Sequence, residues 1–393
     1  MTVPDTRVAP YDPAYETAVA RANPTGRPLL RGWLLTGLVS AGFALAALVL
    51  TAYYGATFGV VAFPLGLLFA ALPLGIVIPT FLWLDRFEAE PKKYLITAFL
   101  WGALIAALVA ALFNTGALIV FESATDQTSA RSATAVAIAP LVEESLKGLF
   151  VLLVWRLRRR EFDGLTDGLV YGGVTAAGFA FTENIQYLAH AFTEGGPEMF
   201  AGTFLARGLL SPFAHPMFTI LTGAGIGVAA TSRTWLPKVA APVIGWTLAV
   251  LAHGAWNLSA VSGAQGFVAG YALVGFPLFL AFLALVLWAR AREGRLIAQY
   301  LHPYVDAGWL SRGEVAMLSQ MRHRREANAW AKLNGGAQAL RAMRAFQDSA
   351  SELALLRKRM SHSAADDHAL ATERILLDSL TARRREFTGQ ALV

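Results

Sequence analysis

Three ionisable residues lie in the middle of an apolar run that is long enough to cross a membrane. The run covers residues 133–155, and the three residues are Glu143, Glu144 and Lys147. An ionisable side chain at that depth costs about 2.5–3.5 kcal/mol on insertion scales, so three within five positions need a functional reason. On a helix Lys147 shares a face with Glu143 and lies near Glu144, so it can partly neutralise either carboxylate. The alternative is a polar cluster that only holds helices together, a task that usually falls to Ser, Thr or Asn.

Further polar groups interrupt three later apolar segments. His253 and Asn257 are four residues apart and share a helix face. Prolines flank His215 and break the backbone hydrogen-bond ladder there, which is tolerated in a membrane only inside protein or beside a water-filled cavity. Counted along their segments, these groups can converge on one cavity between mid-bilayer and the outer face, with Arg207 as a charge partner or substrate anchor. The three stretches are Phe179-Ala180-Phe181-Thr182-Glu183-Asn184, Ser211-Pro212-Phe213-Ala214-His215-Pro216 and His253-Gly254-Ala255-Trp256-Asn257.

This set of side chains supports acid–base chemistry or a metal ion. Zinc in catalytic sites accepts two histidines and one glutamate with a water in the open position. His215 and His253 with one of Glu143 or Glu183 would satisfy that count, although the local HExxH arrangement is absent. The same residue types also occur in the proton relays of transporters.

Composition indicates the elements that must position these groups. The 393 residues are 55% hydrophobic and only 15% charged, which excludes an ordinary soluble protein and fits a polytopic membrane protein. The chain contains no cysteine, so disulfides, a thiolate nucleophile and Cys-ligated metals are excluded.

Eight apolar segments reach or exceed the roughly 20 residues that a bilayer requires. We therefore predict an all-α polytopic membrane protein with about eight transmembrane helices and a helical cytoplasmic C-terminal region. The second segment contains three prolines, so a kink is expected there. The segments cover residues 32–56, 59–84, 94–120, 133–155, 164–188, 199–230, 238–260 and 266–289.

Basic residues cluster on alternate loops. They precede the first segment and follow the second, fourth, sixth and eighth, whereas the intervening loops hold Arg131 and otherwise acidic residues. The positive-inside rule then makes both termini cytoplasmic, and we predict an integral protein of the cell membrane.

We expect three regions along the chain: a cytoplasmic, disordered leader at residues 1–29, a transmembrane domain at 30–290 and a cytoplasmic helical region at 291–393. Residues 290–393 carry a net charge of +6. Apolar residues there recur at helical spacing, with breaks expected near Gly308, Gly335-Gly336 and residues 361–367. The basic surface could rest on anionic lipid, or it could be a solvated tail. No aromatic-basic motif accompanies the charge, so no nucleic-acid partner is expected.

The polar motifs together resemble those of the PrsW family of intramembrane proteases, within the superfamily of type II CAAX-processing and bacteriocin-processing enzymes. Each motif alone is weak, but all occur in order on successive segments, and the resemblance covers about residues 80–290. The Lys of the first motif and Glu183 at the end of the second distinguish the chain from CAAX proteases. The matching stretches are Glu143-Glu144-x-x-Lys147, Phe179-x-x-x-Glu183-Asn184, His215, His253-x-x-x-Asn257, Trp83-Leu84-Asp85-Arg86-Phe87-Glu88-Ala89-Glu90-Pro91 and Phe162-Asp163-Gly164-x-x-Asp167-Gly168.

The resemblance implies an intramembrane endopeptidase that cleaves a membrane-anchored protein, for example a regulator such as an anti-sigma factor. Peptide hydrolysis needs an activated water, oxyanion stabilisation and a proton for the leaving amine. We expect Glu143 to be the general base, supported by Glu144 and opposed in charge by Lys147. His253 and Asn257 are candidate oxyanion donors.

The water needs a holder, and the candidates are Glu183 and His215, acting directly or through a metal. Possible metal ligands are His215, His253, Glu143 and Glu183. A site with zinc or another divalent ion and a metal-free glutamate mechanism stay equally open. A proton-coupled transporter and a non-catalytic membrane scaffold are the alternatives; the absence of an internal repeat speaks against the first, and the intact His253–Asn257 pair against the second.

Overall fold

The computed structural model describes residues 29–87, 89–159, 162, 164–362 and 367–389. Throughout these residues the chain forms helices joined by short turns, without a β-strand, which confirms the predicted all-α class. The predicted leader lies outside the described residues except for its last position.

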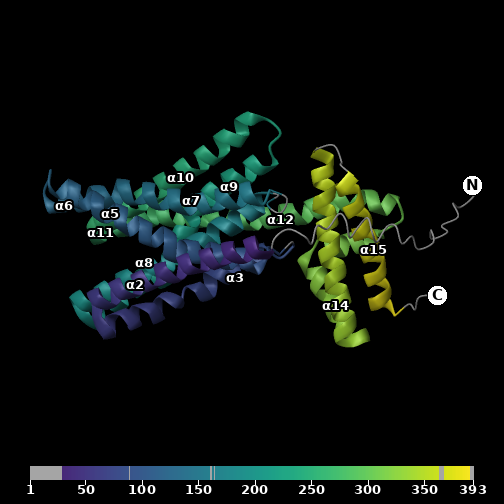
Figure 1. Ribbon diagram of the computed structural model, residues 1–393, viewed down its shortest axis with the longest axis horizontal. Coiled ribbons are helices and arrows are strands. Elements are labelled where there is room, and N and C mark those ends of the chain that lie inside the picture. The colour runs from purple at the N-terminus through teal and green to yellow at the C-terminus, as the bar shows by residue number, and fades with distance from the viewer. Residues whose placement is uncertain (1–28, 88, 160–161, 163, 363–366, 390–393) are drawn as a thin grey trace, which may run out of the picture.

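The membrane part of the chain is a series of long helices, four of which pass into π-helical turns labelled η (Figure 1). Their bounds are α2 (Leu29–Ala71), α3 (Leu74–Leu84), α4 (Lys92–Leu100), η1 (Trp101–Ala106), α5 (Ala107–Glu122), α6 (Gln127–Ala133), η2 (Thr134–Ile138), α7 (Ala139–Leu157), α8 (Leu165–Phe204), η3 (Leu205–Leu210), α9 (Ala214–Thr231), α10 (Trp235–Val261), α11 (Gly263–Gly270), η4 (Tyr271–Gly275) and α12 (Phe276–Asp306).

Five stretches among the described residues are long and apolar enough to cross a bilayer. Two of them, of 49 and 67 residues, far exceed the roughly 20 residues that one crossing needs. Each is divided by a glycine in the left-handed region, Gly59 with φ 74° and Gly196 with φ 64°, which a side chain would disfavour. These turns divide the five stretches into seven passes, and α6–η2–α7, whose buried charges set it apart, makes an eighth. The protein is therefore a polytopic membrane protein.

Helices α8 and α9 form the centre of the bundle. In their joint stretch 72% of the most apolar window is buried, whereas the corresponding share is between 11% and 33% in the other four stretches. A close approach of the two backbones permits this burial, because a Cβ on Gly168 would overlap the Gly223 carbonyl, and the reverse also holds. Small residues at helix crossings are the usual means of packing helices in lipid. The outer helices instead present apolar side chains outward, as expected of lipid-facing surfaces.

Helix α12 leaves the bundle and leads into the C-terminal region, which lies at one end of the molecule (Figure 1). This region comprises α13 (Arg312–Leu318), α14 (Met321–His362) and α15 (Asp367–Thr388). Two of the predicted breaks are confirmed: α12 ends before Gly308, and Gly335 and Gly336 are non-helical within α14. The third, at residues 361–367, lies mostly outside the described residues. The predicted boundary at residue 290 falls within α12, and the division into domains stays a prediction.

The C-terminal region has its own apolar core, which includes Phe346, Leu353, Leu377 and Leu380. Phe87, from the turn between α3 and α4, belongs to the same core and is 4% exposed. The turn after the second pass therefore anchors the C-terminal helices to the membrane bundle.

Candidate active site

The three charged residues in the middle of α7 are buried together. Glu143, Glu144 and Lys147 are 5%, 0% and 0% exposed, respectively. Lys147 Nζ donates to Glu144 Oε1 at 2.5 Å and lies 3.8 Å from Glu143 Oε2. The spacing of three and four residues on one helix produces both contacts. One ammonium therefore compensates part of the charge of two carboxylates inside the bundle.

Two histidines from different helices complete this cluster. His253 on α10 places Nδ1 3.0 Å from Glu144 Oε1 and Nε2 3.8 Å from Glu143 Oε2. His215 is in the first turn of α9, and its Nδ1 lies 3.3 Å from Lys147 Nζ. The two imidazole rings are perpendicular, with centroids 5.1 Å apart. Residues almost 110 positions apart in the chain thus surround one point.

Glu183 on α8 belongs to the same cluster and is paired with the side chain of Arg207. Arg207 on η3 donates to Glu183 Oε2 at 2.5 Å and to Asn184 Oδ1 at 2.8 Å, and it stacks on the ring of Tyr187. His215 Nε2 lies 2.5 Å from Glu183 Oε2. Arg207 is thus a charge partner of the site, one of the two roles that the sequence left open.

In the non-helical turn before α9, several backbone groups form hydrogen bonds within the turn itself. The Ser211 amide and hydroxyl both donate to the Ala206 carbonyl, and the Ala214 amide donates to the Ser211 carbonyl. Unpaired backbone is costly in a membrane, so these bonds allow the chain to turn beside the site. The turn places His215 at the start of α9, where it faces α7 and α8.

Asn257 lies one helical turn beyond His253 on α10. Its Nδ2 donates to the Ala135 carbonyl in η2 at 2.8 Å, so one of its two amide hydrogens is already used. The wide π-helical turn that accepts this bond also lines the cavity described next. π-Helical turns occur frequently at functional sites.

A cavity of about 260 Å³ adjoins these groups. Its polar lining includes Glu143, Glu183, Asn257, Asn114 and Arg131. His253 and Lys147 contact Glu143 but do not themselves line the cavity. The structure thus brings all six predicted catalytic residues, together with His215, into one contiguous cluster, in which Glu143 and Glu183 face the open space.

Two contributors were not expected from the motifs. Asn114 on α5 donates Nδ2 to Glu143 Oε1 at 3.3 Å, and its own Oδ1 is buried without a hydrogen-bond partner. Thr219 on α9 donates its hydroxyl to Glu144 Oε2 at 2.7 Å. A lone Asn in the third apolar segment was the available signal for Asn114. Thr219 gave no comparable signal, because threonine is common in membrane helices.

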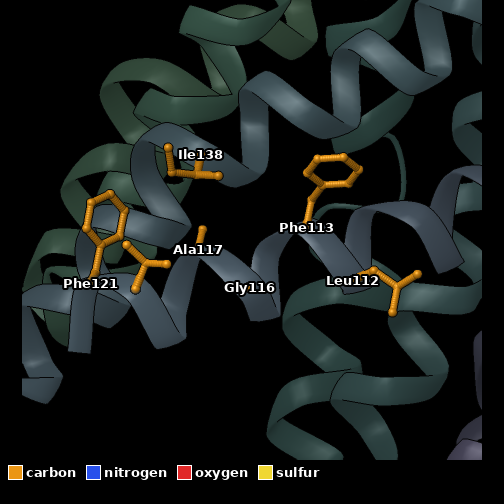
Figure 2. Close-up of a pocket in the computed structure, with 7 residues that line it drawn as sticks. Leu112, Phe113, Gly116, Ala117, Phe121 and Ile138 are labelled. Atoms are coloured by element: carbon orange, nitrogen blue, oxygen red, sulfur yellow. The ribbon is translucent and has the colours of Figure 1, made fainter. Parts of the chain in front are cut away.

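The opposite face of α5 carries a larger, apolar groove of about 510 Å³ (Figure 2). Its lining has no polar side chain and consists of Leu112, Phe113, Gly116, Ala117, Val120, Phe121 and Ile138. A groove of this composition can hold a hydrocarbon group but offers nothing for catalysis. Helix α5 therefore separates an apolar groove from the polar cavity.

The donor set fits a divalent metal ion. Glu143, His215 and His253 each offer one ligand atom, and these atoms lie within 4.8 Å of one another. Glu143 Oε2 is buried without a hydrogen bond, and His253 Nε2 faces it while Nδ1 is held by Glu144, a common second partner of ligating histidines. His215 has contacts at both nitrogens, so it would exchange one of them to bind a metal. Glu183 instead faces Arg207 and His215.

The net charge of the cluster is also compatible with a bound cation. Glu143, Glu144 and Glu183 bring three carboxylates, while Lys147 and Arg207 bring two fixed cations. With neutral imidazoles the cluster retains one negative charge, so it attracts a cation. One proton would neutralise it, and a divalent ion would leave a net charge of +1. Buried charges are costly unless they are paired.

Comparison with known proteins agrees with this geometry. The profile described as PrsW family intramembrane metalloprotease matches residues 90–286, about half of the chain. The chain belongs to the PrsW family. The PrsW match includes every one of the polar motifs from Glu143 to Asn257, and it favours the protease hypothesis over the transporter and the scaffold.

Individual PrsW relatives cover different shares of the chain. The protease PrsW of Geobacillus kaustophilus is 30% identical over 164 residues, which are 42% of this chain and 66% of the relative. That of Clostridioides difficile is 31% identical over 139 residues, 35% of this chain and 55% of the relative. That of Oceanobacillus iheyensis is 28% identical over 233 residues, 59% of this chain and 99% of the relative. The chain thus spans less than two thirds of the first two relatives. No solved structure matches it.

Proposed function

We propose that this PrsW-family protein is an intramembrane endopeptidase that hydrolyses a peptide bond of a membrane-anchored protein. The observation that carries the proposal is the buried Glu143 carboxylate. One of its oxygens lacks a hydrogen bond, and the residue faces a cavity that Glu183 and Asn257 also line. A carboxylate held in this way is ready to accept a proton from a water molecule.

Each residue of the cluster has a proposed role. Glu143 Oε2 takes the proton of the attacking water and later delivers it to the leaving amine, which is general acid–base catalysis. Glu144 orients His253 through Nδ1 and holds Lys147. The second amide hydrogen of Asn257 and, when the imidazole is protonated at both nitrogens, His253 Nε2 are the proposed donors to the oxyanion. Glu183, fixed by Arg207 and His215, bounds the water on the other side of the cavity.

In a metal-dependent form of the mechanism, Glu143, His215 and His253 would hold a divalent cation, with zinc the best match to one carboxylate and two imidazoles. Glu143 Oε2 and His253 Nε2 would then be ligands, and the roles of base and oxyanion donor given to them above belong to the metal-free form. A bound metal would lower the pKa of a water and polarise the scissile carbonyl. The roles of Glu144 and Lys147 in orienting His253 and balancing charge do not depend on the identity of that cation.

The proposal places the protein in the cell membrane with both termini in the cytoplasm. The basic residues on alternate loops support this orientation. The C-terminal region, attached to one end of the bundle, is then cytoplasmic, and α6 lies toward the opposite, extracytoplasmic end (Figure 1). A membrane-anchored regulator such as an anti-sigma factor is the proposed class of substrate.

Reconstitution tests the proposal. The full-length protein in liposomes is mixed with single-pass substrate proteins, and mass spectrometry identifies the new termini. We expect cleavage that is absent with Glu143→Gln prepared in parallel, which excludes a contaminating protease. Equal cleavage by both preparations would contradict the proposed catalytic centre.

Metal dependence is tested on the same preparation. The protein is stripped with a membrane-permeant chelator, its metal content is measured, and zinc is then restored in steps. We expect activity to disappear with the metal and to return at about one ion per chain, as for a catalytic site with three protein ligands. Full activity in metal-free protein would instead assign the reaction to the carboxylates alone.

A further inference from the structure

Arg131 is a basic residue on the side of the bundle where the positive-inside pattern calls for none. It lies on α6, is exposed, and lines the same cavity as Glu143. Unlike Arg207, which is paired with Glu183, Arg131 makes no ion pair with any described residue. A cation at the wall of the cavity that forms no ion pair with the described part of the chain is available to a ligand.

Helix geometry connects Arg131 to the catalytic carboxylate. Helices α6 and α7 are joined without a break through η2, and the lining residues Arg131, Ala135, Ala139 and Glu143 follow one another at intervals of four. Residues at that spacing share a face of the helix. The face therefore carries an arginine at one end, a carboxylate at the other, and two alanines between them.

Small side chains from another helix also line the cavity: Ala107, Ala110 and Ala111 of α5, together with the larger rings of Tyr53, Tyr54 and Tyr187. We call the part of the cavity between Arg131 and Glu143 the slot. The buried Glu143 Oε2, which lacks a hydrogen bond, lies at one end of it. A slot with a base at one end fits an extended peptide better than it fits a packed helix.

The length of the slot sets a register. Twelve residues separate Arg131 from Glu143, which corresponds to about 18 Å at 1.5 Å per helical residue. An extended peptide advances about 3.3–3.6 Å per residue, so about five substrate residues cover that distance.

We propose that Arg131 binds an acidic side chain of the substrate about five residues from the scissile bond, on the side facing away from the C-terminal region. The proposal rests on the proposed function, because it assigns the peptide bond to Glu143. It makes the preferred substrate a membrane-anchored protein with a Glu or Asp in its extracytoplasmic flank, at a fixed distance from the cleavage site.

A glutamate scan tests the register. Single-pass substrates with an otherwise neutral flank carry one Glu at positions one to eight from the scissile bond, and the reconstituted full-length protein cleaves them at low ionic strength. We expect kcat/KM to be highest with Glu at positions four to six, about two- to fivefold above the neutral substrate, mainly through KM, as for one exposed ion pair. The preference should weaken as salt is added.

Charge reversal completes the test. With Arg131→Glu the preference should change to a substrate with Lys at the same position, and Arg131→Lys should retain the preference for Glu. Gln127→Glu serves as the control. It places a carboxylate on α6 one turn further from Glu143 than Arg131, at a residue that does not line the cavity. If Gln127→Glu alters the preference as strongly as Arg131→Glu, the effect is general surface charge and the proposal is wrong.

The two hypotheses fail differently. If the wild-type protein cleaves all Glu positions equally, Arg131 is not a recognition residue, although the protease assignment stands. If wild-type and Glu143→Gln proteins are equally inactive or equally active on every substrate, the proposed function itself is contradicted.

Discussion

Lys147 in the membrane bundle and Arg324 in the C-terminal region are both buried cations, 0% and 4% exposed. Lys147 contacts titratable side chains: Glu144, Glu143 and His215 lie within 4 Å of Nζ. Arg324 contacts fixed partners instead. Its guanidinium donates to the Leu318 carbonyl and the Ser351 hydroxyl, both at 2.7 Å, and lies over the ring of Phe87.

The partners of the two cations indicate different tasks: the cluster around Lys147 resembles a functional site, and the cluster around Arg324 is structural. Around Lys147 the partners can change protonation state or bind a ligand, and Glu143 Oε2 and Asn114 Oδ1 are left without hydrogen bonds beside open space. Around Arg324 the partners are the carbonyls of Leu318 and Phe87, a hydroxyl and a ring, which hold α13, α14 and the turn at Phe87 together. Substitutions in the first cluster should therefore change catalysis, and substitutions in the second should change stability.

Glu143→Gln should give the largest effect. It keeps the shape of the side chain and removes the base, so turnover should fall by about 100-fold or more. The apparent melting temperature should not fall, because the neutral amide is cheaper to bury than a carboxylate. Single-turnover cleavage and thermal unfolding in the same detergent measure the two quantities. If Glu143→Gln were active but less stable than the wild-type protein, the cluster around Lys147 would be structural rather than catalytic.

Arg324→Met should give the opposite pattern. The substitution keeps an apolar stem but leaves the Leu318 carbonyl and Ser351 hydroxyl without their charged donor, which should cost about 1–3 kcal/mol of stability. Limited proteolysis of α13–α15 measures this loss. Arg322→Met is the matched control, because Arg322 lies on the same helix but its side chain is 81% exposed. Equal protease resistance of the two variants would show that Arg324 does not hold the region together.

Asn114→Ala should give a smaller catalytic effect. Losing the amide that donates to Glu143 Oε1 should lower kcat about tenfold, the equivalent of one hydrogen bond to a charged group. Because Asn114 positions the base, we expect KM to change little. Ser123→Ala, at the exposed end of α5, removes a polar group without reaching the site. A rise in KM with unchanged kcat would make Asn114 a substrate contact instead.

Asp85 should give the smallest effect, and one that depends on pH. It lies just after α3, outside the membrane spans, and is 3% exposed. Burial raises its pKa to about 8, with further contributions from the Glu90 and Glu293 carboxylates, while the Glu90 amide, which donates to Oδ2, opposes the shift. The folded state thus favours the neutral acid. Its contribution to stability is complete below about pH 4 and is lost as the pH rises through 8.

The apparent melting temperature of the wild-type protein should therefore fall more between pH 5 and pH 8 than that of Asp85→Asn. Thermal unfolding at several pH values measures the difference, which we expect to be a few degrees. Asp378→Asn serves as the control, since the Asp378 side chain is 63% exposed. Parallel pH curves for the wild-type protein and Asp85→Asn would contradict the expected titration.

Much of the fold could be predicted because lipid imposes simple rules. Apolar length alone predicted the segments that appear as eight helical passes, and glycine positions predicted the breaks of the C-terminal helices. The prolines of the second pass predicted a kink, and the chain does turn at Leu72-Pro73, between α2 and α3. Paired charges in an apolar run likewise marked the site, because burying them without function is costly.

By itself, the sequence predicted the candidate site residues: Glu143, Glu144 and Lys147 on one helix, and Glu183, His215, His253 and Asn257 on others. The tertiary structure alone decided which residues meet between helices. Lys147 contacts His215, Arg207 is paired with Glu183, and Asn114 reaches Glu143 across the bundle. The physical reason is that spacing along one helix fixes neighbours within about a turn. Contacts between helices depend on rotation and depth, which are set by close approaches such as that of Gly168 and Gly223.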